Sequence, residues 1–104
     1  MTNLFDDLPR QADQELVTEL LRRRGARIER IVSTGQSTPV DKPYIQDYDE
    51  WVLLVSGLAG LWIEGEGERE LRPGDYVLIP SHRAHRVTWT PKGELTVWLT
   101  VHFS

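Results

Sequence analysis

Two groups of polar side chains in this 104-residue chain have the types and spacing that metal binding or acid–base chemistry needs. Tyr44, Gln46 and Glu50 come directly before an apolar run, and His82 and His85 follow a segment that begins with Gly74 and ends with Pro80. Carboxylate, imidazole and amide groups can hold divalent metals, and several of them can move protons. These five residues are therefore the first candidates for a functional site.

The sequence contains no cysteine, which excludes disulfide bonds, thiolate metal ligands and cysteine nucleophiles. Any bound metal must then be held by imidazole, carboxylate or amide groups. Residues two apart on a strand share a face, so Tyr44 and Gln46 can point into one cavity while Glu50 and His85 approach from neighbouring strands. Neutral imidazole with a carboxylate and open positions suits zinc, iron, nickel or manganese. The alternative is a metal-free hydrogen-bonded network of the same four side chains.

The elements that must position these residues are predicted to be short strands preceded by one helix. Residues 13–24 are expected to form the helix, capped by Asp13, with an apolar stripe on one face and Gly25 at its end. After it, Val-, Ile-, Leu- and Trp-rich segments alternate with Gly, Pro and Asp about every ten residues, which is typical of an antiparallel barrel or sandwich. The expected strands are residues 27–33, 36–40, 43–46, 51–55, 59–64, 68–71, 76–79, 85–89 and 95–103. Hairpin turns are expected at 65–68 and 72–75.

The two polar groups lie in motifs that resemble those of the cupin superfamily. Six residues separate Glu50 from Gly57, and five separate Gly74 from Pro80, with His85 shortly after. The resemblance covers roughly residues 33–103 and is closest to small single-domain bacterial cupins, most of which have no assigned function. It implies an all-β fold, the double-stranded β-helix or jelly-roll barrel, with the short helix added at the N-terminus. The expected organisation is an extension at residues 1–25 and a cupin barrel at 26–104.

Carried over position by position, the resemblance makes Glu50 and His85 metal ligands, with Gln46 as a further weak oxygen ligand. Tyr44 and Gln46 stand where cupins with the full ligand set have two histidines. His82, a nearby imidazole, stands where the motif usually has glycine. The cofactor implied is a divalent transition metal, namely zinc, iron, nickel or manganese.

Three functions are compatible with these motifs. In a metal-dependent enzyme acting on a small molecule, such as a dioxygenase, isomerase or lyase, Tyr44 or His82 would move a proton. In a metal-free binding protein, Trp89, Tyr44 and Gln46 would line a ligand pocket; Trp89 is chosen because it shares strand parity with His85. A purely structural oligomerisation domain is the third. His102 is expected to be a packing or surface residue.

Composition narrows the partners further. The net charge of −4 argues against nucleic-acid binding, and the arginines at 22, 23, 24 and 27 are interpreted as a solvated helix end. No apolar run approaches the roughly 20 residues of a membrane-spanning helix, and residues 1–10 lack the basic start of a signal peptide. The sequence therefore predicts a cytoplasmic protein without nucleic-acid or membrane partners. A homodimer is expected, because cupin barrels commonly pair through an exposed sheet edge.

Overall fold

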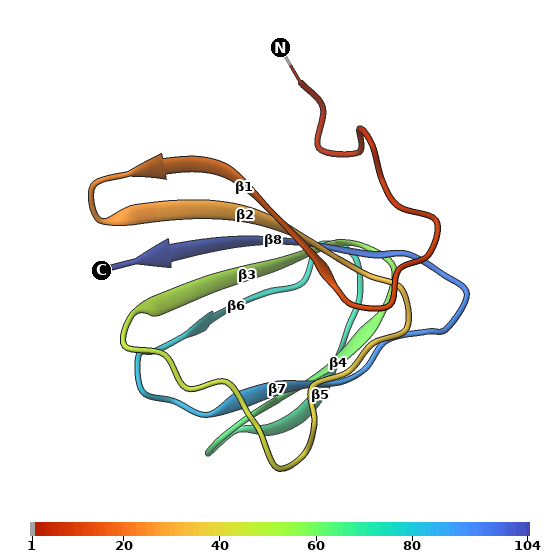
Figure 1. Cartoon of the computed structure of the whole chain (residues 1–104). Coiled ribbons are helices and arrows are strands. Elements are labelled where there is room, and N and C mark those ends of the chain that lie inside the picture. Colours follow the sequence, from red (N-terminus) through yellow and green to blue (C-terminus); the bar gives the residue numbers. More distant parts are fainter. Residues whose placement is uncertain (1) are drawn as a thin grey trace.

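The computed structural model describes residues 2–104, which fold into two antiparallel β-sheets facing each other (Figure 1). The eight strands are β1 (Leu16–Arg23), β2 (Ala26–Ser33), β3 (Asp49–Ser56), β4 (Ala59–Ile63), β5 (Gly67–Leu71), β6 (Tyr76–Ile79), β7 (His85–Trp89) and β8 (Thr96–Phe103). One sheet has the order β1-β2-β8-β3-β6, and the other has the order β5-β4-β7. The all-β class predicted from the sequence is confirmed. Residues 2–104 contain no helix that is long and apolar enough to cross a membrane.

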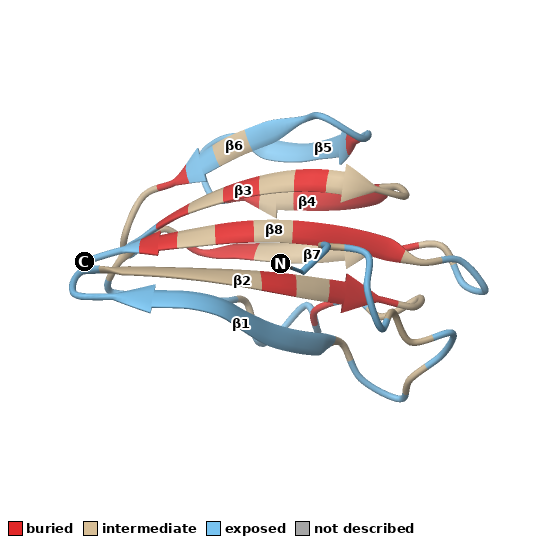
Figure 2. Cartoon of the chain, turned by 90° about the horizontal axis from the view of Figure 1, so that it is seen from above, coloured by how far each residue is buried: buried red, intermediate tan, exposed pale blue. Residues whose placement is uncertain are grey.

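The hydrophobic core lies between the two sheets, where alternate side chains of each strand point inward. Buried positions run along β2, β3, β4 and β8, whereas β1 and most of β5 are exposed (Figure 2). The buried core residues are Val52, Leu54, Ala59, Leu61, Ile63, Leu71, Ile79 and Trp98. This core fills the end of the barrel near Leu54 and leaves the polar end of β3, at Glu50, for the site.

The helix predicted at residues 13–24 is wrong, because most of this segment is strand β1. It pairs antiparallel with β2, from Leu16 opposite Val32 to Arg23 opposite Ala26. Gly25 has a φ of 77° and belongs to the tight turn between the two strands instead of ending a helix. The backbone hydrogen bonds that this segment makes with the free edge of β2 favour a strand, although its apolar residues have the spacing of a helix. The domain boundary predicted at residue 25 thus falls inside a hairpin of the five-stranded sheet.

Two of the predicted strands, 36–40 and 43–46, are also wrong and belong to the long connection between β2 and β3. Pro39 and Pro43 cannot donate backbone hydrogen bonds, and Lys42 closes a turn onto the Pro39 carbonyl. The connection is still held against β7. Tyr44 and His85 exchange two backbone hydrogen bonds of 2.8 and 3.0 Å. This bridge places Tyr44 beside His85 without a continuous strand.

The turns that the sequence predicted at 65–68 and 72–75 are confirmed. Gly65 and Gly67 have φ values of 85° and 84°, and the Asp75 amide donates to the Arg72 carbonyl. Gly57, the glycine of the first motif, is required by space as well as by its φ of 90°. A Cβ atom there would lie 2.5 Å from the Leu95 carbonyl oxygen. The β3–β4 turn can therefore approach β8 closely only with glycine at this position.

Candidate functional site in the barrel interior

The candidate site is a cavity of about 210 Å³ between the sheets. Its walls come from every strand except β5 and from the connection that carries Tyr44, Gln46 and Tyr48. A larger pocket of about 360 Å³ lies along the β5–β6 region, and no histidine lines it. We place the site in the smaller cavity because the candidate residues Tyr44, Gln46, Glu50 and His85 all line it. The structure thus brings the predicted metal ligands together.

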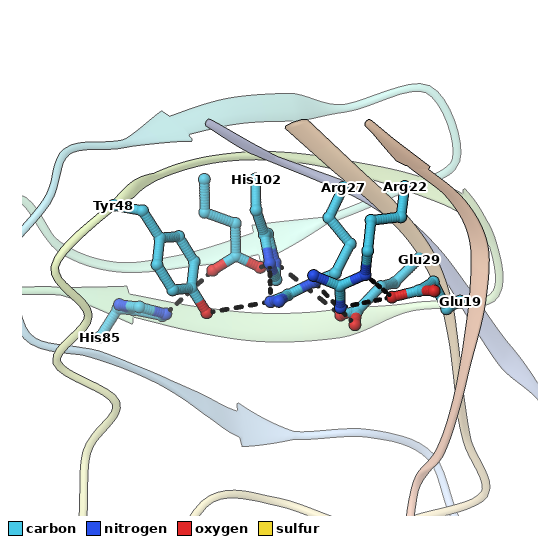
Figure 3. Close-up of polar contacts among 8 residues, drawn as sticks. Glu19, Arg22, Arg27, Glu29, Tyr48, His85 and His102 are labelled. Atoms are coloured by element: carbon cyan, nitrogen blue, oxygen red, sulfur yellow. Dashed lines mark hydrogen bonds and ion pairs between the residues drawn. The ribbon is translucent and has the colours of Figure 1, made fainter. Parts of the chain in front are cut away.

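Glu50 lines this cavity, and its two carboxylate oxygens contact two different imidazole rings. Those rings belong to His85 and His102, which are labelled in Figure 3. Its Oε1 atom is 3.4 Å from His85 Nε2, and its Oε2 atom is 3.4 Å from His102 Nε2. All three residues are at least nine-tenths buried. Both contacts are longer than an ordinary hydrogen bond. Oε1 of Glu50 and Nε2 of His102 have no well-formed hydrogen-bond partner among residues 2–104.

The two histidines hold Glu50 in its ionised form. Burial raises the pKa of the carboxyl group, because a buried charge loses its hydration. The contacts with His102 and His85, and the charges of these rings when protonated, outweigh that effect and lower the pKa of Glu50 to about 2. Glu50 is therefore a carboxylate at neutral pH, ready to accept a proton, a hydrogen bond or a cation.

His85 presents an unshared electron pair to Glu50 when its ring is neutral. Its Nδ1 atom is 3.1 Å from the Arg83 carbonyl oxygen, which can only accept, so Nδ1 carries the ring proton. Nε2 then faces Glu50 Oε1 without a proton between the two atoms. Two electron-rich atoms at 3.4 Å repel each other unless a proton or a metal ion lies between them. This gap is the chemically unusual feature of the cavity.

His102 has the opposite proton arrangement. Arg27 contacts its Nδ1 through Nη2, and a guanidinium can only donate hydrogen bonds. Nδ1 must therefore accept, which leaves the proton of the neutral ring on Nε2, facing Glu50. Arg27 is fixed in turn by Glu29, at 3.1 Å, and by Tyr48, whose hydroxyl oxygen is 3.4 Å away. The packing or surface role expected for His102 from the sequence leaves out its place in the site. The β3–β8 pairing reveals that place, because it puts His102 opposite Glu50.

The remaining predicted residues divide into two groups. Tyr44 and Gln46 line the cavity, and the Tyr44 ring centre is 5.7 Å from that of His85. Burial, and then the nearby Glu15 carboxylate, raise the pKa of Tyr44, so its hydroxyl stays protonated. His82 is exposed, has a φ of 65°, and does not line the cavity. Its left-handed backbone explains why the related motif usually has glycine there.

Trp98, rather than Trp89, is the tryptophan that lines the cavity. The pairing of β4 with β7 shifts between Gly60 and Leu61, which breaks the simple parity between His85 and Trp89. The Trp89 indole packs directly over Gly60, where a Cβ atom would overlap the ring. Trp98 is buried, and its indole nitrogen donates to Ser33 Oγ at 3.2 Å. The Ser33 hydroxyl donates in turn to Glu15 at 2.6 Å.

Glu50 and His85 fit a divalent metal in part. Two ligand atoms, each about 2.1 Å from a tetrahedral ion, are about 3.4 Å apart, which matches the separation of Oε1 and Nε2. The hydrogen bond from His85 Nδ1 to a carbonyl is the usual outer contact of a metal-binding imidazole. However, residues 2–104 contain no group of three or more His, Asp or Glu side chains arranged to hold a metal. Gln46, Tyr44, water or a ligand would have to complete the shell.

The chain belongs to the cupin family. The model of the cupin domain matches residues 30–102, which include the whole cavity wall except Glu15, Val17, Arg27 and Glu29. The jelly-roll barrel and the resemblance predicted from the two motifs are confirmed. No curated protein matches the chain.

Solved structures give the same fold. A protein from Ralstonia eutropha JMP134, described as a "putative mannose-6-phosphate isomerase", is 48% identical with a TM-score of 0.95, covering 100% of this chain and 97% of that one. TT1209 from Thermus thermophilus is 16% identical with a TM-score of 0.81, covering 99% and 95%. A protein described as "DMSP lyase DddQ" from Ruegeria pomeroyi DSS-3 is 20% identical with a TM-score of 0.76, covering 88% of this chain and 48% of that one. The last two similarities concern the fold alone.

Proposed function

We propose that this cupin binds one divalent transition metal between Glu50 and His85 and acts on a small oxygen-bearing molecule in the barrel cavity. The observation that carries the proposal is the buried pair of electron-rich atoms, Glu50 Oε1 and His85 Nε2, facing each other at 3.4 Å. A metal ion would convert their repulsion into attraction. Zinc, iron, nickel and manganese all accept this ligand chemistry.

The charge of the cavity supports a cation there. Its charged lining consists of three carboxylates, Glu15, Glu29 and Glu50, and one guanidinium, Arg27. Arg27 is already engaged with Glu29 and His102. In surroundings of low dielectric, an excess of carboxylates attracts a divalent cation and repels an anionic ligand. We therefore expect the metal-free cavity to disfavour phosphorylated molecules, and a bound divalent ion to balance the two excess negative charges.

A bound metal would supply a Lewis acid that polarises a substrate oxygen. The residues of this chain would do the rest. Glu50 and His85 would hold the ion, and Gln46 would add a weak oxygen ligand. Tyr44, whose hydroxyl stays protonated, would donate a proton or a hydrogen bond from the cavity mouth. His82 is a weaker candidate for this proton-donating role, because it is exposed and does not line the cavity. Trp98 and the aliphatic lining would exclude water from the reacting atoms.

The name of the Ralstonia relative supports an isomerase as the reaction class. Aldose–ketose isomerisation moves a proton between adjacent carbon atoms, which a carboxylate or a tyrosine next to a polarised oxygen can assist. The one guanidinium of the cavity, Arg27, is engaged with Glu29 and His102, which favours a substrate without the phosphate group that the relative's name includes. Substrate screens should therefore begin with unphosphorylated hydroxycarbonyl compounds.

A metal-free binding protein is the second candidate. Tyr44 and Gln46 occupy the positions of two histidine ligands, and no third His, Asp or Glu joins Glu50 and His85 in metal-binding geometry among residues 2–104. In this case a proton would lie between Glu50 and His85, as an imidazolium–carboxylate pair.

Elemental analysis separates the two candidates. Protein purified without a histidine tag or chelator should contain about one equivalent of a transition metal per chain. His85→Ala should lose it, whereas the exposed β1 variant Thr18→Val should retain it. Absence of metal from the wild type, even after incubation with each ion and desalting, would refute the metal proposal and leave the binding protein.

The homodimer expected from the sequence and the cytoplasmic location both stay predictions. Strand β1 supports pairing with a second copy, because it is an edge strand with exposed aliphatic side chains. Those side chains are Leu16, Val17, Leu20 and Leu21. Sedimentation of the wild type and Leu20→Lys would test this: a dimer that the lysine converts to a monomer supports pairing at β1, and a monomeric wild type contradicts it.

A further inference from the structure

Arg27, His102 and Glu50 lie side by side on three adjacent strands. Arg27 of β2 is the register partner of His102 of β8, and His102 is the register partner of Glu50 of β3. All three side chains line the cavity. The three form a row in which His102 contacts the guanidinium through Nδ1 and the carboxylate through Nε2. The contact between Arg27 and His102 is drawn in Figure 3. His102 therefore connects the cation of the cavity to its central carboxylate.

The order of donors and acceptors in this row is fixed by chemistry. Arg27 can only donate, so His102 Nδ1 accepts and Nε2 carries the proton. That N–H is buried and lies 3.4 Å from Glu50 Oε2 and 3.9 Å from Glu29 Oε1. It has no other acceptor among residues 2–104. Neutral His102 thus presents its single N–H to the side of Glu50 that faces away from His85.

We propose that Arg27 and His102 are positioning residues for Glu50. Arg27 selects the His102 tautomer, and the His102 N–H attracts Oε2. The carboxylate is held so that Oε1, its other oxygen, remains open toward His85. If His102 carried its proton on Nδ1, its Nε2 electron pair would repel Oε2, and the carboxylate would be free to rotate away from the gap. Outer contacts of this kind commonly orient metal-binding carboxylates and imidazoles.

Glu29 and Tyr48 complete the support of this arrangement. Glu29 binds Arg27 Nε at 3.1 Å, and the Tyr48 ring stacks on His102 with a centroid separation of 4.7 Å. The Arg27 guanidinium also lies over the Tyr48 ring, 5.6 Å from its centre. Arg27 is therefore held on one side by a carboxylate and on the other by an aromatic ring, which leaves it in place to donate to His102.

The first test is the His102 tautomer in metal-free protein, which does not depend on the proposed function. The chain has only three histidines, so ¹⁵N-labelled rings can be assigned with single His82→Gln and His85→Gln variants. Two-bond nitrogen–proton correlations at neutral pH should show His102 protonated on Nε2 alone. In Arg27→Gln this preference should be lost, while Arg22→Gln, at an exposed β1 arginine, should retain it. A wild-type His102 protonated on Nδ1 would overturn the inference even if Arg27→Gln fails to fold, and so would an unchanged tautomer in Arg27→Gln.

The second test measures metal affinity and rests on the proposed function. Titration calorimetry with Zn²⁺ should give a dissociation constant raised roughly 10–100-fold in His102→Leu, as is usual when an outer contact of a ligand is lost. His102→Gln should recover most of this loss, because its amide can donate from nearly the position of Nε2. Equal affinity of His102→Leu and wild type would overturn the positioning role. A wild type that binds no Zn²⁺ would instead refute the proposed function, and the tautomer measurement would then decide this inference alone.

Discussion

Glu50 and His85 approach each other at 3.4 Å through atoms that both carry unshared electron pairs when the imidazole is neutral. The only ring proton of neutral His85 is on Nδ1, which donates it to the Arg83 carbonyl oxygen. That proton therefore cannot lie between Nε2 and Glu50. This relationship connects the fold to the proposed chemistry. A cation in the gap, either a proton or a metal ion, is needed to make the contact favourable.

The ionisation of Glu50 predicts a loss of stability in acid. The pKa of this carboxyl group is about 2 in the folded chain against 4.5 as its ordinary value. Because the folded pKa is the lower one, the contribution is complete above pH 4.5 and is lost as the pH falls toward 2. Its size is about 3 kcal/mol in the free energy of unfolding. Urea titrations of wild type and Glu50→Gln between pH 7 and pH 2 measure it.

The variant supplies the control for this measurement. Glu50→Gln should be less stable than the wild type at pH 7, because two imidazoles lose their carboxylate, and the difference should shrink below pH 4. A constant difference between the two proteins across the whole range would contradict the low pKa of Glu50.

The acidic lining of the cavity predicts a preference against phosphate. Ligand-observed NMR on metal-free protein with mannose and mannose 6-phosphate should show no tighter binding of the phosphorylated sugar, because Arg27 is engaged with Glu29 and the carboxylates of Glu15, Glu29 and Glu50 repel an anion. The opposite result would be tighter binding of mannose 6-phosphate by the wild type and loss of this binding in Arg27→Gln. It would contradict the proposed repulsion of anions. It would identify Arg27 as a substrate contact instead.

The position of Trp89 predicts the effect of a substitution in β4. Gly60→Ala should lower the free energy of unfolding by roughly 1–3 kcal/mol, because its methyl group would overlap the Trp89 ring and the Thr88 side chain. Gly60 has no positive φ, so the cost is steric alone. Chemical denaturation followed by tryptophan fluorescence measures the change. A neutral Gly60→Ala would show that Trp89 does not pack on β4.

The attachment of the N-terminal segment to the barrel is predicted to depend on Arg30. Arg30 is buried and donates from Nη1 to the carbonyl oxygens of Leu4 and Asp6, at 2.9 and 2.7 Å. Arg30→Met should lower the free energy of unfolding by roughly 1–3 kcal/mol, since it removes charged hydrogen bonds. Hydrogen exchange should speed up in residues 3–8 more than in β3. Uniform exchange rates with unchanged stability would contradict this role.

The sequence predicted the barrel and named four residues that line the candidate cavity, namely Tyr44, Gln46, Glu50 and His85. It succeeded where the local pattern agrees with the fold. The spacings of the two motifs can be recognised without knowing which strands pair. The strands near the motif residues Gly57, Pro80 and His85 were correctly predicted. Residues 16–23 were wrongly predicted as helix, because the spacing of their apolar residues suits a helix. They form a strand because they hydrogen-bond to the free edge of β2. Such a preference comes from tertiary hydrogen bonding, which no local window contains.

His102 and Trp89 show the same limit within the site. His102 became a candidate only once β8 was paired with β3, which put it opposite Glu50. Trp89 was assigned to the interior by parity, and a shift in the β4–β7 pairing moved it over Gly60. Alternation along a strand predicts a shared face only while the pairing stays regular.

The most direct test of the central claim is anomalous diffraction from crystals grown with zinc or manganese, measured on both sides of the absorption edge of the metal. We expect one anomalous peak between Glu50 Oε1 and His85 Nε2, at about 2.1 Å from each, and no such peak in His85→Ala. A peak held by other residues, or an empty gap in protein saturated with metal, would contradict it.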